Sequence, residues 1–160
     1  MKLTTLFLMI LLYLTCGAQQ TGNLTIHGKV KYKTSLLDDV KIEVYKDNQL
    51  QQEAKSLRNG SFRLDLKLGS IYNVTYLKKD FIEKSVAVIA RADSSLVING
   101  RFYFQLDIEL YKEGDGQTDN TVLPPVAKLY IKDATTGFSY DKKYVRWISD
   151  QYEEALEDEK

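Results

Sequence analysis

The feature that most constrains the fold of this 160-residue chain is a strict alternation of apolar and polar residues that follows Asn59-Gly60. The apolar set faces a charged set: Phe62, Leu64, Leu66 and Leu68 alternate with Arg63, Asp65 and Lys67. A period of two buries one face of a β-strand and leaves the other in water. Because Asn-Gly tolerates positive φ, it also predicts a β-hairpin at this point.

The same alternation recurs along most of the chain. Turn-forming residues separate short segments that we expect to be strands, at 24–32, 40–45, 51–57, 62–68, 72–77, 81–89, 102–110 and 126–131. Several short strands at such spacing indicate a sandwich rather than a parallel α/β sheet. Helical spacing after Asp141, a potential N-cap, predicts a helix at 141–157. The sequence therefore predicts a mostly β fold: an antiparallel β-sandwich with an appended C-terminal strand region and a terminal α-helix.

The first residues predict export. Lys2 supplies a positive charge, an apolar run extends to Leu14, and small residues lead up to Ala18. This pattern is typical of a secretory signal peptide at 1–18, with cleavage after Ala18. We expect no transmembrane segment in the mature chain, because the apolar run is too short to span a bilayer. Lipid attachment at Cys16 is less favoured, since the residues before that cysteine do not fit a lipid site.

The first half of the chain resembles the carboxypeptidase regulatory-like domain, a transthyretin-like sandwich. The resemblance is carried by Gly28-x-Val30, Leu37-x-x-Val40-x-Ile42-x-Val44-Tyr45, Asn59-Gly60-Ser61-Phe62, Tyr72-x-Val74 and Lys79-Asp80-Phe81. Asp80 stands where the family usually has Gly, and Asp tolerates the same left-handed backbone. The resemblance implies a non-catalytic accessory module at 22–92, followed by a C-terminal β extension at 93–160.

The second half resembles the tail of a family of small, uncharacterised exported proteins from the Gram-negative envelope. The matching motifs are Phe102 to Leu110, Pro125 to Ile131, and Tyr140 to Tyr144 at the start of the helix. The resemblance implies a periplasmic or outer-membrane-associated protein. It implies no activity.

The residue types argue against an enzyme, a cofactor and a nucleic-acid partner. Charges balance at 22 against 22, so electrostatics give no reason to expect nucleic acid. After cleavage the chain would keep no cysteine and one imidazole, His27, whose parity points away from the core. No triad can be built on cysteine, and a serine triad would need His27 beside Ser and Asp in an unusual strand geometry. One histidine does not supply the usual zinc ligands, so we predict no catalytic residue and no metal site.

One loop has the spacing of oxygen ligands. Asp115, Gln117 and Asp119 alternate in the loop at 113–120, as ligands do in calcium loops. Asn120 replaces the expected glycine, and Val126 stands at the twelfth position in place of Glu. We therefore favour a hairpin loop over a calcium site.

These observations favour a non-enzymatic, exported module of the cell envelope that binds another envelope protein. Tyr103, Asp107 and Glu109 share the outward face of one strand and form a possible partner surface. The alternative is a carbohydrate-binding module that uses the outward-facing tyrosines Tyr45, Tyr103 and Tyr111 to bind a glycan. A third hypothesis, less favoured, is a hydrolase that uses Asp107 and Glu109, which strand geometry places about 7 Å apart.

Overall fold

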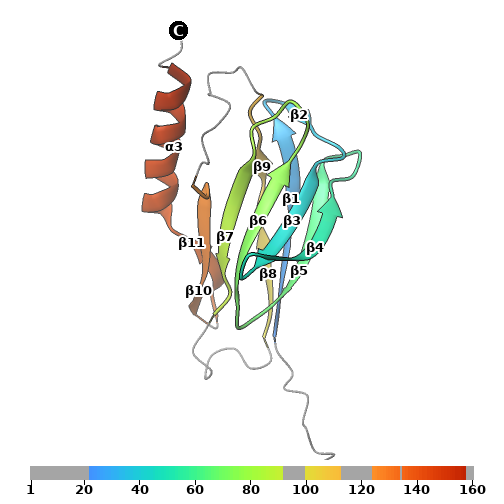
Figure 1. Cartoon of the computed structure of the whole chain (residues 1–160). Coiled ribbons are helices and arrows are strands. Elements are labelled where there is room, and N and C mark those ends of the chain that lie inside the picture. The colour runs from blue at the N-terminus through green and yellow to red at the C-terminus, as the bar shows by residue number, and fades with distance from the viewer. Residues whose placement is uncertain (1–21, 92–99, 113–123, 134, 158–160) are drawn as a thin grey trace, which may run out of the picture.

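The computed structural model describes residues 22–91, 100–112, 124–133 and 135–157. These residues form two β-sheets packed face to face, with one helix at the side of the sandwich (Figure 1). The predicted signal peptide, with Cys16 and Ala18, and the predicted calcium or hairpin loop at 113–120 lie outside the described residues.

The smaller sheet has five described strands and is built around β1 (Asn23–Tyr32). On one side β1 pairs antiparallel with β5 (Ser61–Lys67) and with the short β2 (Ser35–Leu36). On the other side it pairs in parallel with β8 (Arg101–Gln105) and then β9 (Ile108–Glu109). Strand β1 therefore joins the beginning of the chain to its second half.

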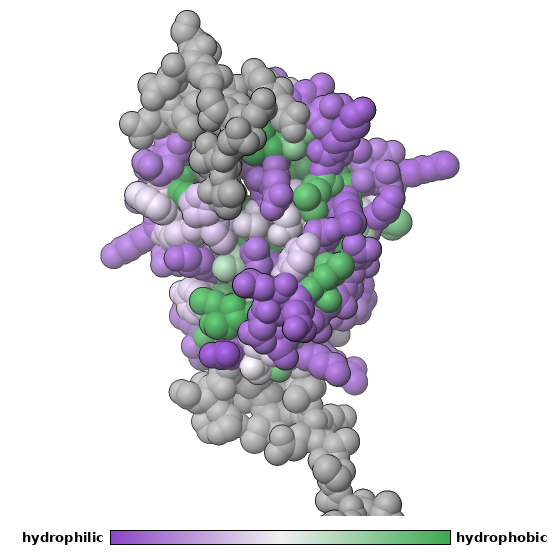
Figure 2. All heavy atoms as spheres, viewed as in Figure 1, coloured by the Kyte–Doolittle hydropathy of each residue, from purple (hydrophilic) through white to green (hydrophobic). Residues whose placement is uncertain are grey.

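The larger sheet has six described strands in the order β11-β10-β7-β6-β3-β4. Their bounds are β3 (Lys41–Lys46), β4 (Gln49–Lys55), β6 (Ile71–Leu77), β7 (Lys84–Ile89), β10 (Ala127–Asp133) and β11 (Gly137–Tyr140). All neighbours in this sheet are antiparallel except β7 and β10. Figure 2 shows the molecule in the same view as Figure 1. Hydrophilic residues dominate this surface, and apolar residues form small separate patches on it.

The predicted fold class is confirmed: the chain is a mostly β sandwich with a C-terminal helix. The sheets are mixed rather than wholly antiparallel, because β8 and β9 run parallel to β1, and β10 runs parallel to β7. All three of these strands come from the predicted extension at 93–160. Strands from both predicted segments thus belong to the same two sheets.

The core lies between the sheets and follows the predicted alternation. In β5 every second residue is buried, and the intervening charged residues are exposed. Leu24, Ile42 and Val74, from three different strands, have no exposed surface. Burial of this apolar surface is the main free-energy contribution that holds the two sheets together.

The turn at Asn59-Gly60 was predicted to close a β-hairpin, and that prediction is wrong. Gly60 does adopt a positive φ of 70°, and its N–H donates to the Leu57 carbonyl at 2.8 Å. However, β4 before the turn pairs with β3, whereas β5 after it pairs with β1. The local sequence determines the turn, but the chain passes from one sheet to the other because each flanking strand has a different partner.

Two other turns take the backbone that their residues allow. Asp47 and Asn48 have φ values of 50° and 60° and join β3 to β4, which is the pattern of a type I′ hairpin. Asp80 has a φ of 66°. The expectation that this Asp takes the left-handed backbone is therefore confirmed.

Helix α3 (Lys142–Glu157) begins where the sequence predicts. The Asp141 carboxylate accepts hydrogen bonds from the N–H groups of Lys143 and Tyr144, at 2.9 and 3.0 Å, as an N-cap does. Val145 and Ile148 face inward from the helix, and Tyr144 donates its hydroxyl to the Pro125 carbonyl. Within the described ranges no helix has both the length and the apolarity needed to cross a membrane.

Candidate functional site

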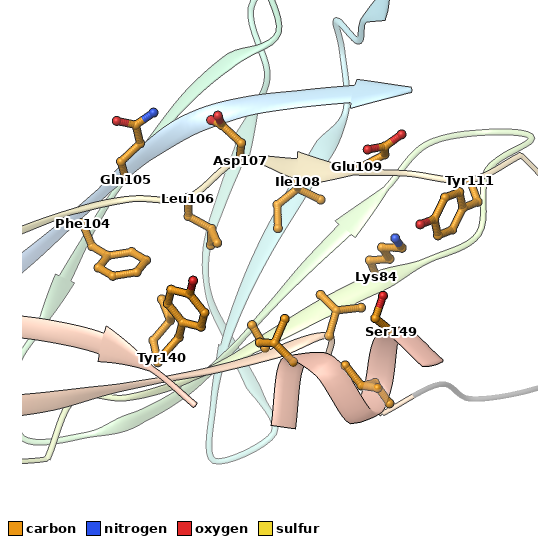
Figure 3. A pocket seen from close by; sticks show the side chains of 15 residues that line it. Lys84, Phe104, Gln105, Leu106, Asp107, Ile108, Glu109, Tyr111, Tyr140 and Ser149 are labelled. Carbon is orange, nitrogen blue, oxygen red and sulfur yellow. The ribbon is translucent and has the colours of Figure 1, made fainter. Parts of the chain in front are cut away.

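The predicted partner residues share the outer face of the five-stranded sheet. Tyr103 is 66% exposed on β8. Asp107 and Glu109 point to the same side as Gln105, away from the interior of the sandwich (Figure 3). The structure thus brings the three predicted residues onto one face, as the alternation required.

Asp107 holds a break in the strand ladder. Its Oδ1 atom accepts a hydrogen bond from the backbone N–H of Lys29 at 2.9 Å. The pairing of β8 with β1 ends at His27, and that of β9 begins at Val30. Between them the Leu106 carbonyl lies so close to Gly28 that a Cβ at this position would overlap it. The Asp107 carboxylate therefore takes the place of a backbone carbonyl as the acceptor for the Lys29 N–H, at the point where Gly28 allows the Leu106 backbone to come close to β1.

Glu109 has a comparable structural role on the next strand. Its carboxylate lies 3.2 Å from the Lys31 ammonium of β1. The two carboxylates are thus each held by β1 rather than directed at a common point, and Figure 3 shows both on the outer side of their strands. This geometry gives no support to the hydrolase hypothesis.

The surface beside Tyr103 carries polar side chains that bond to one another. The strand registers place Asp65, Thr25 and Tyr103 in one row across β5, β1 and β8. Thr25 is only 8% exposed although it faces outward, and its hydroxyl donates to Asp65. The Arg63 guanidinium pairs with Asp65 at 3.2 Å, and Arg63 and Thr25 together hold the pKa of that carboxyl below its ordinary value.

The outward-facing tyrosines do not gather on one surface. Tyr45 lies on β3 in the other sheet, where it donates a hydrogen bond to Glu43 at 2.6 Å. Tyr111 follows β9, and its ring centroid lies 3.7 Å from the Lys84 ammonium. Tyr103 is thus the one predicted tyrosine that stands exposed on the face formed by β5, β1 and β8.

Sequence reasoning missed Lys84. This lysine begins β7 and shares parity with the buried Val86 and Val88, so that it faces the interior and is only 7% exposed. Burial lowers the pKa of its ammonium to about 8, against the opposing effect of the Glu109 charge. The available signal was a lysine in phase with two core valines, a place where charged residues are rare.

His27 is exposed, as its parity predicted. Among the residues that the structure describes, no three histidine, cysteine or acidic side chains are grouped as metal ligands. The fold and this face define a β-sandwich module with an outward polar surface on its five-stranded sheet, on which Tyr103 is exposed from β8.

Comparisons with known proteins give distant structural likenesses. A scan against protein-family models finds no match, and neither does a search of the curated proteins. One similar solved structure is a DUF3823 family protein from Parabacteroides merdae, at 18% identity and a TM-score of 0.41. The match covers 57% of this chain and 47% of that protein.

Two further solved structures are similar to part of this chain at low sequence identity. The Bacillus anthracis TIE protein matches at 11% identity and a TM-score of 0.42, over 56% of this chain and 17% of its own. A catechol 1,2 dioxygenase from Acinetobacter radioresistens matches at 11% identity and a TM-score of 0.47, over 69% and 59%. This chain spans less than two thirds of each of the three proteins. The carboxypeptidase regulatory-like resemblance remains a prediction.

Proposed function

We propose that this chain is a non-enzymatic, exported module of the cell envelope that binds another envelope protein through the outer face of its five-stranded sheet. The carboxypeptidase regulatory-like assignment belongs to this proposal, because that resemblance implies an accessory module without catalysis. The observation that carries the proposal is Tyr103, which is 66% exposed on β8, beside paired polar side chains of β1 and β5.

The surroundings of Tyr103 favour protein contact. Energetically dominant residues in interfaces are enriched in Tyr and Arg, and Arg63 lies two strands away on the same face. The pairing of Arg63 and Thr25 with Asp65 orders these side chains before a partner arrives. Ordered groups lose less conformational entropy on association, which favours affinity.

The three predicted residues take different parts in this proposal. Tyr103 is the contact residue. Asp107 and Glu109 bond to β1 and so hold the strands that present it. A glycan partner receives less support, because the tyrosines that would form a sugar-binding platform lie in different places on the sandwich.

Photo-crosslinking in the cells that produce the chain naturally tests the proposal. Benzoylphenylalanine replaces Gln105, which is exposed beside Tyr103, and a control chain carries it at Tyr130, which is 36% exposed on β10 of the other sheet. We expect a crosslinked species of defined mass from position 105, its loss when Tyr103→Ala is added, and no such species from position 130.

The crosslinking results of these three chains decide the outcome. Equal crosslinking from both positions, or a species that survives Tyr103→Ala, contradicts the proposed face. If the folded chain binds to a glycan array and Tyr103→Ala abolishes this binding, the partner is a carbohydrate rather than a protein.

A further inference from the structure

The outer edge of β8 carries backbone groups with which no described strand pairs. In the parallel ladder with β1, the Asn23 N–H donates to the Gly100 carbonyl at 3.0 Å, and the Leu106 N–H donates to the His27 carbonyl at 2.9 Å. Because the direction of the backbone groups alternates along a strand, the even-numbered residues of β8 bond to β1. The odd-numbered residues therefore direct their N–H and C=O groups to the free edge: Arg101, Tyr103 and Gln105.

This edge lacks the charged side chains that protect the edges of β4 and β5. Edge strands usually avoid pairing with other chains by carrying charged residues or proline. The exposed positions of β5 are Arg63, Asp65 and Lys67, and β4 ends with Glu53-Ala54-Lys55. In β8 the one charged residue is Arg101, at its beginning, and the rest are aromatic residues and a glutamine. Aromatic residues favour strands, so β8 is the least protected of these three edge strands.

The side chains on the inner side of β8 hold the strand in position. Phe102 packs edge-on against Phe138 of β11, with ring centroids 5.7 Å apart, and Phe104 packs against the core. Further along the same edge, a cavity of about 330 Å³ lies between β9 and the Val145 and Ile148 side chains of α3 (Figure 3). The β8 edge is thus fixed before a second strand arrives, so little conformational entropy is lost when it pairs.

The sequence of β8 is symmetric about Tyr103. Phe102 and Phe104 flank this tyrosine, and Arg101 and Gln105 stand at the two ends. In an antiparallel pair of β8 strands with a two-fold axis at Tyr103, the two tyrosines lie opposite each other, and each Arg101 lies opposite a Gln105. Opposite residues that both point to the shared edge exchange N–H and C=O hydrogen bonds. This is the register in which every edge-directed residue of β8 finds a partner within the other β8.

We propose that a second copy of this chain pairs with the β8 edge, antiparallel and in the register that places Tyr103 opposite Tyr103. The pair joins the five-stranded sheets of two chains into one continuous sheet. Within the two β8 strands no like charges lie opposite each other, because Arg101 faces the uncharged Gln105, and the two tyrosines form an aromatic cross-strand pair. Pairing of copies goes beyond the proposed binding of an envelope protein and does not depend on it.

Analytical ultracentrifugation of the purified exported form of the chain, from about 5 to about 500 µM, measures this pairing, and amide hydrogen exchange followed by NMR locates it. We expect a reversible monomer–dimer equilibrium, with slower exchange in the dimer for the amides of Arg101, Tyr103 and Gln105. The amides of Phe102 and Phe104 are internal controls that should change less, because they already bond to β1 in the monomer. A chain that stays monomeric at about 500 µM, or a dimer without protection of the three edge amides, would overturn the proposal.

Two lysine variants test the edge itself. Tyr103→Lys places two ammonium groups opposite each other in the pair and leaves the core unchanged, because Tyr103 is exposed, so dimerisation should weaken at least about tenfold. Tyr130→Lys is the matched control, since Tyr130 is also exposed but lies on β10 of the other sheet. Undiminished dimerisation in Tyr103→Lys, or an equal loss in Tyr130→Lys, contradicts the proposed edge. Protection of the edge amides only in a complex with an envelope protein would assign the edge to a strand of that protein and overturn the pairing of copies.

Discussion

The Lys84→Met variant should be more stable than the natural chain at neutral pH. Lys84 is 7% exposed, and its pKa falls from 10.5 to about 8, first because of burial, while the charge of Glu109 acts in the opposite direction. At ~1.36 kcal/mol for each pKa unit, this fall corresponds to about 3 kcal/mol of destabilisation when the amine is protonated. Methionine has a similar unbranched stem and carries no charge into the core.

The aromatic contact offsets part of that cost. The Lys84 ammonium lies 3.7 Å from the Tyr111 ring centroid, and a desolvated cation–π contact contributes about 1–2 kcal/mol. The expected net gain for Lys84→Met at pH 7 is therefore about 1–2 kcal/mol. Its positive sign follows from the two magnitudes, since desolvation of the charge exceeds its attraction to the ring.

The pH dependence gives a second, independent reading of the same cost. In the unfolded chain the lysine keeps its proton up to pH 10.5, whereas in the folded chain it loses the proton near pH 8. Between these values the unfolded state binds more protons, so the stability of the natural chain rises with pH relative to the variant. The stability difference is thus largest below pH 8 and decreases to a small packing difference above 10.5.

Urea denaturation of both chains, followed by circular dichroism from pH 7 to pH 10, measures this difference. Ionisable groups other than Lys84 are common to both proteins, so their titration cancels in the comparison. We expect a higher midpoint for the variant at pH 7 with an unchanged slope, and a gap that narrows towards pH 10. A variant less stable than the natural chain at pH 7, or a gap independent of pH, would refute the reasoning.

Three further predictions concern the core, the strand break and export. Tyr76→Phe should raise the free energy of unfolding by about 1 kcal/mol in urea denaturation, because the Tyr76 hydroxyl is fully buried and has no hydrogen-bond partner among the described residues; a loss of stability would contradict this. Gly28→Ala should lower the free energy of unfolding by about 1–3 kcal/mol in the same assay, because the added Cβ overlaps the Leu106 carbonyl. An unchanged midpoint would contradict this, since it would mean that the chain between β8 and β9 moves away from β1 without cost. Mass spectrometry of the exported protein should find Gln19 as the first residue, whereas a lipid-modified Cys16 would contradict cleavage after Ala18.

Local features of the fold could be predicted from the sequence because they depend on local chemistry. Alternation located the strands and the outward position of Tyr103. The left-handed backbone at Asp80 follows from the short polar side chain, which tolerates that conformation. The N-cap at Asp141 follows from a carboxylate that can reach the first N–H groups of the helix.

Strand partners could not be predicted in the same way, because pairing depends on residues far apart in the chain. Asn59-Gly60 specifies a tight turn, but not that the following strand will pair with β1. The parallel pairing of β8 with β1 depends on Gly28, which has no Cβ and so leaves room for the Leu106 carbonyl. It also depends on Asp107, whose carboxylate accepts a hydrogen bond from the Lys29 N–H. The alternation of apolar and polar residues within one strand gives no information about which strand it pairs with.

Lys84 is the residue at which the alternation of β7 and the cost of burying a charge conflict. A lysine in phase with Val86 and Val88 breaks the rule that the rest of β7 follows, and it does so beside the cavity between β8, β9 and α3. A Lys84→Met variant less stable than the natural chain at pH 7 would show that the contacts of the ammonium, that with the Tyr111 ring among them, outweigh the cost of its burial.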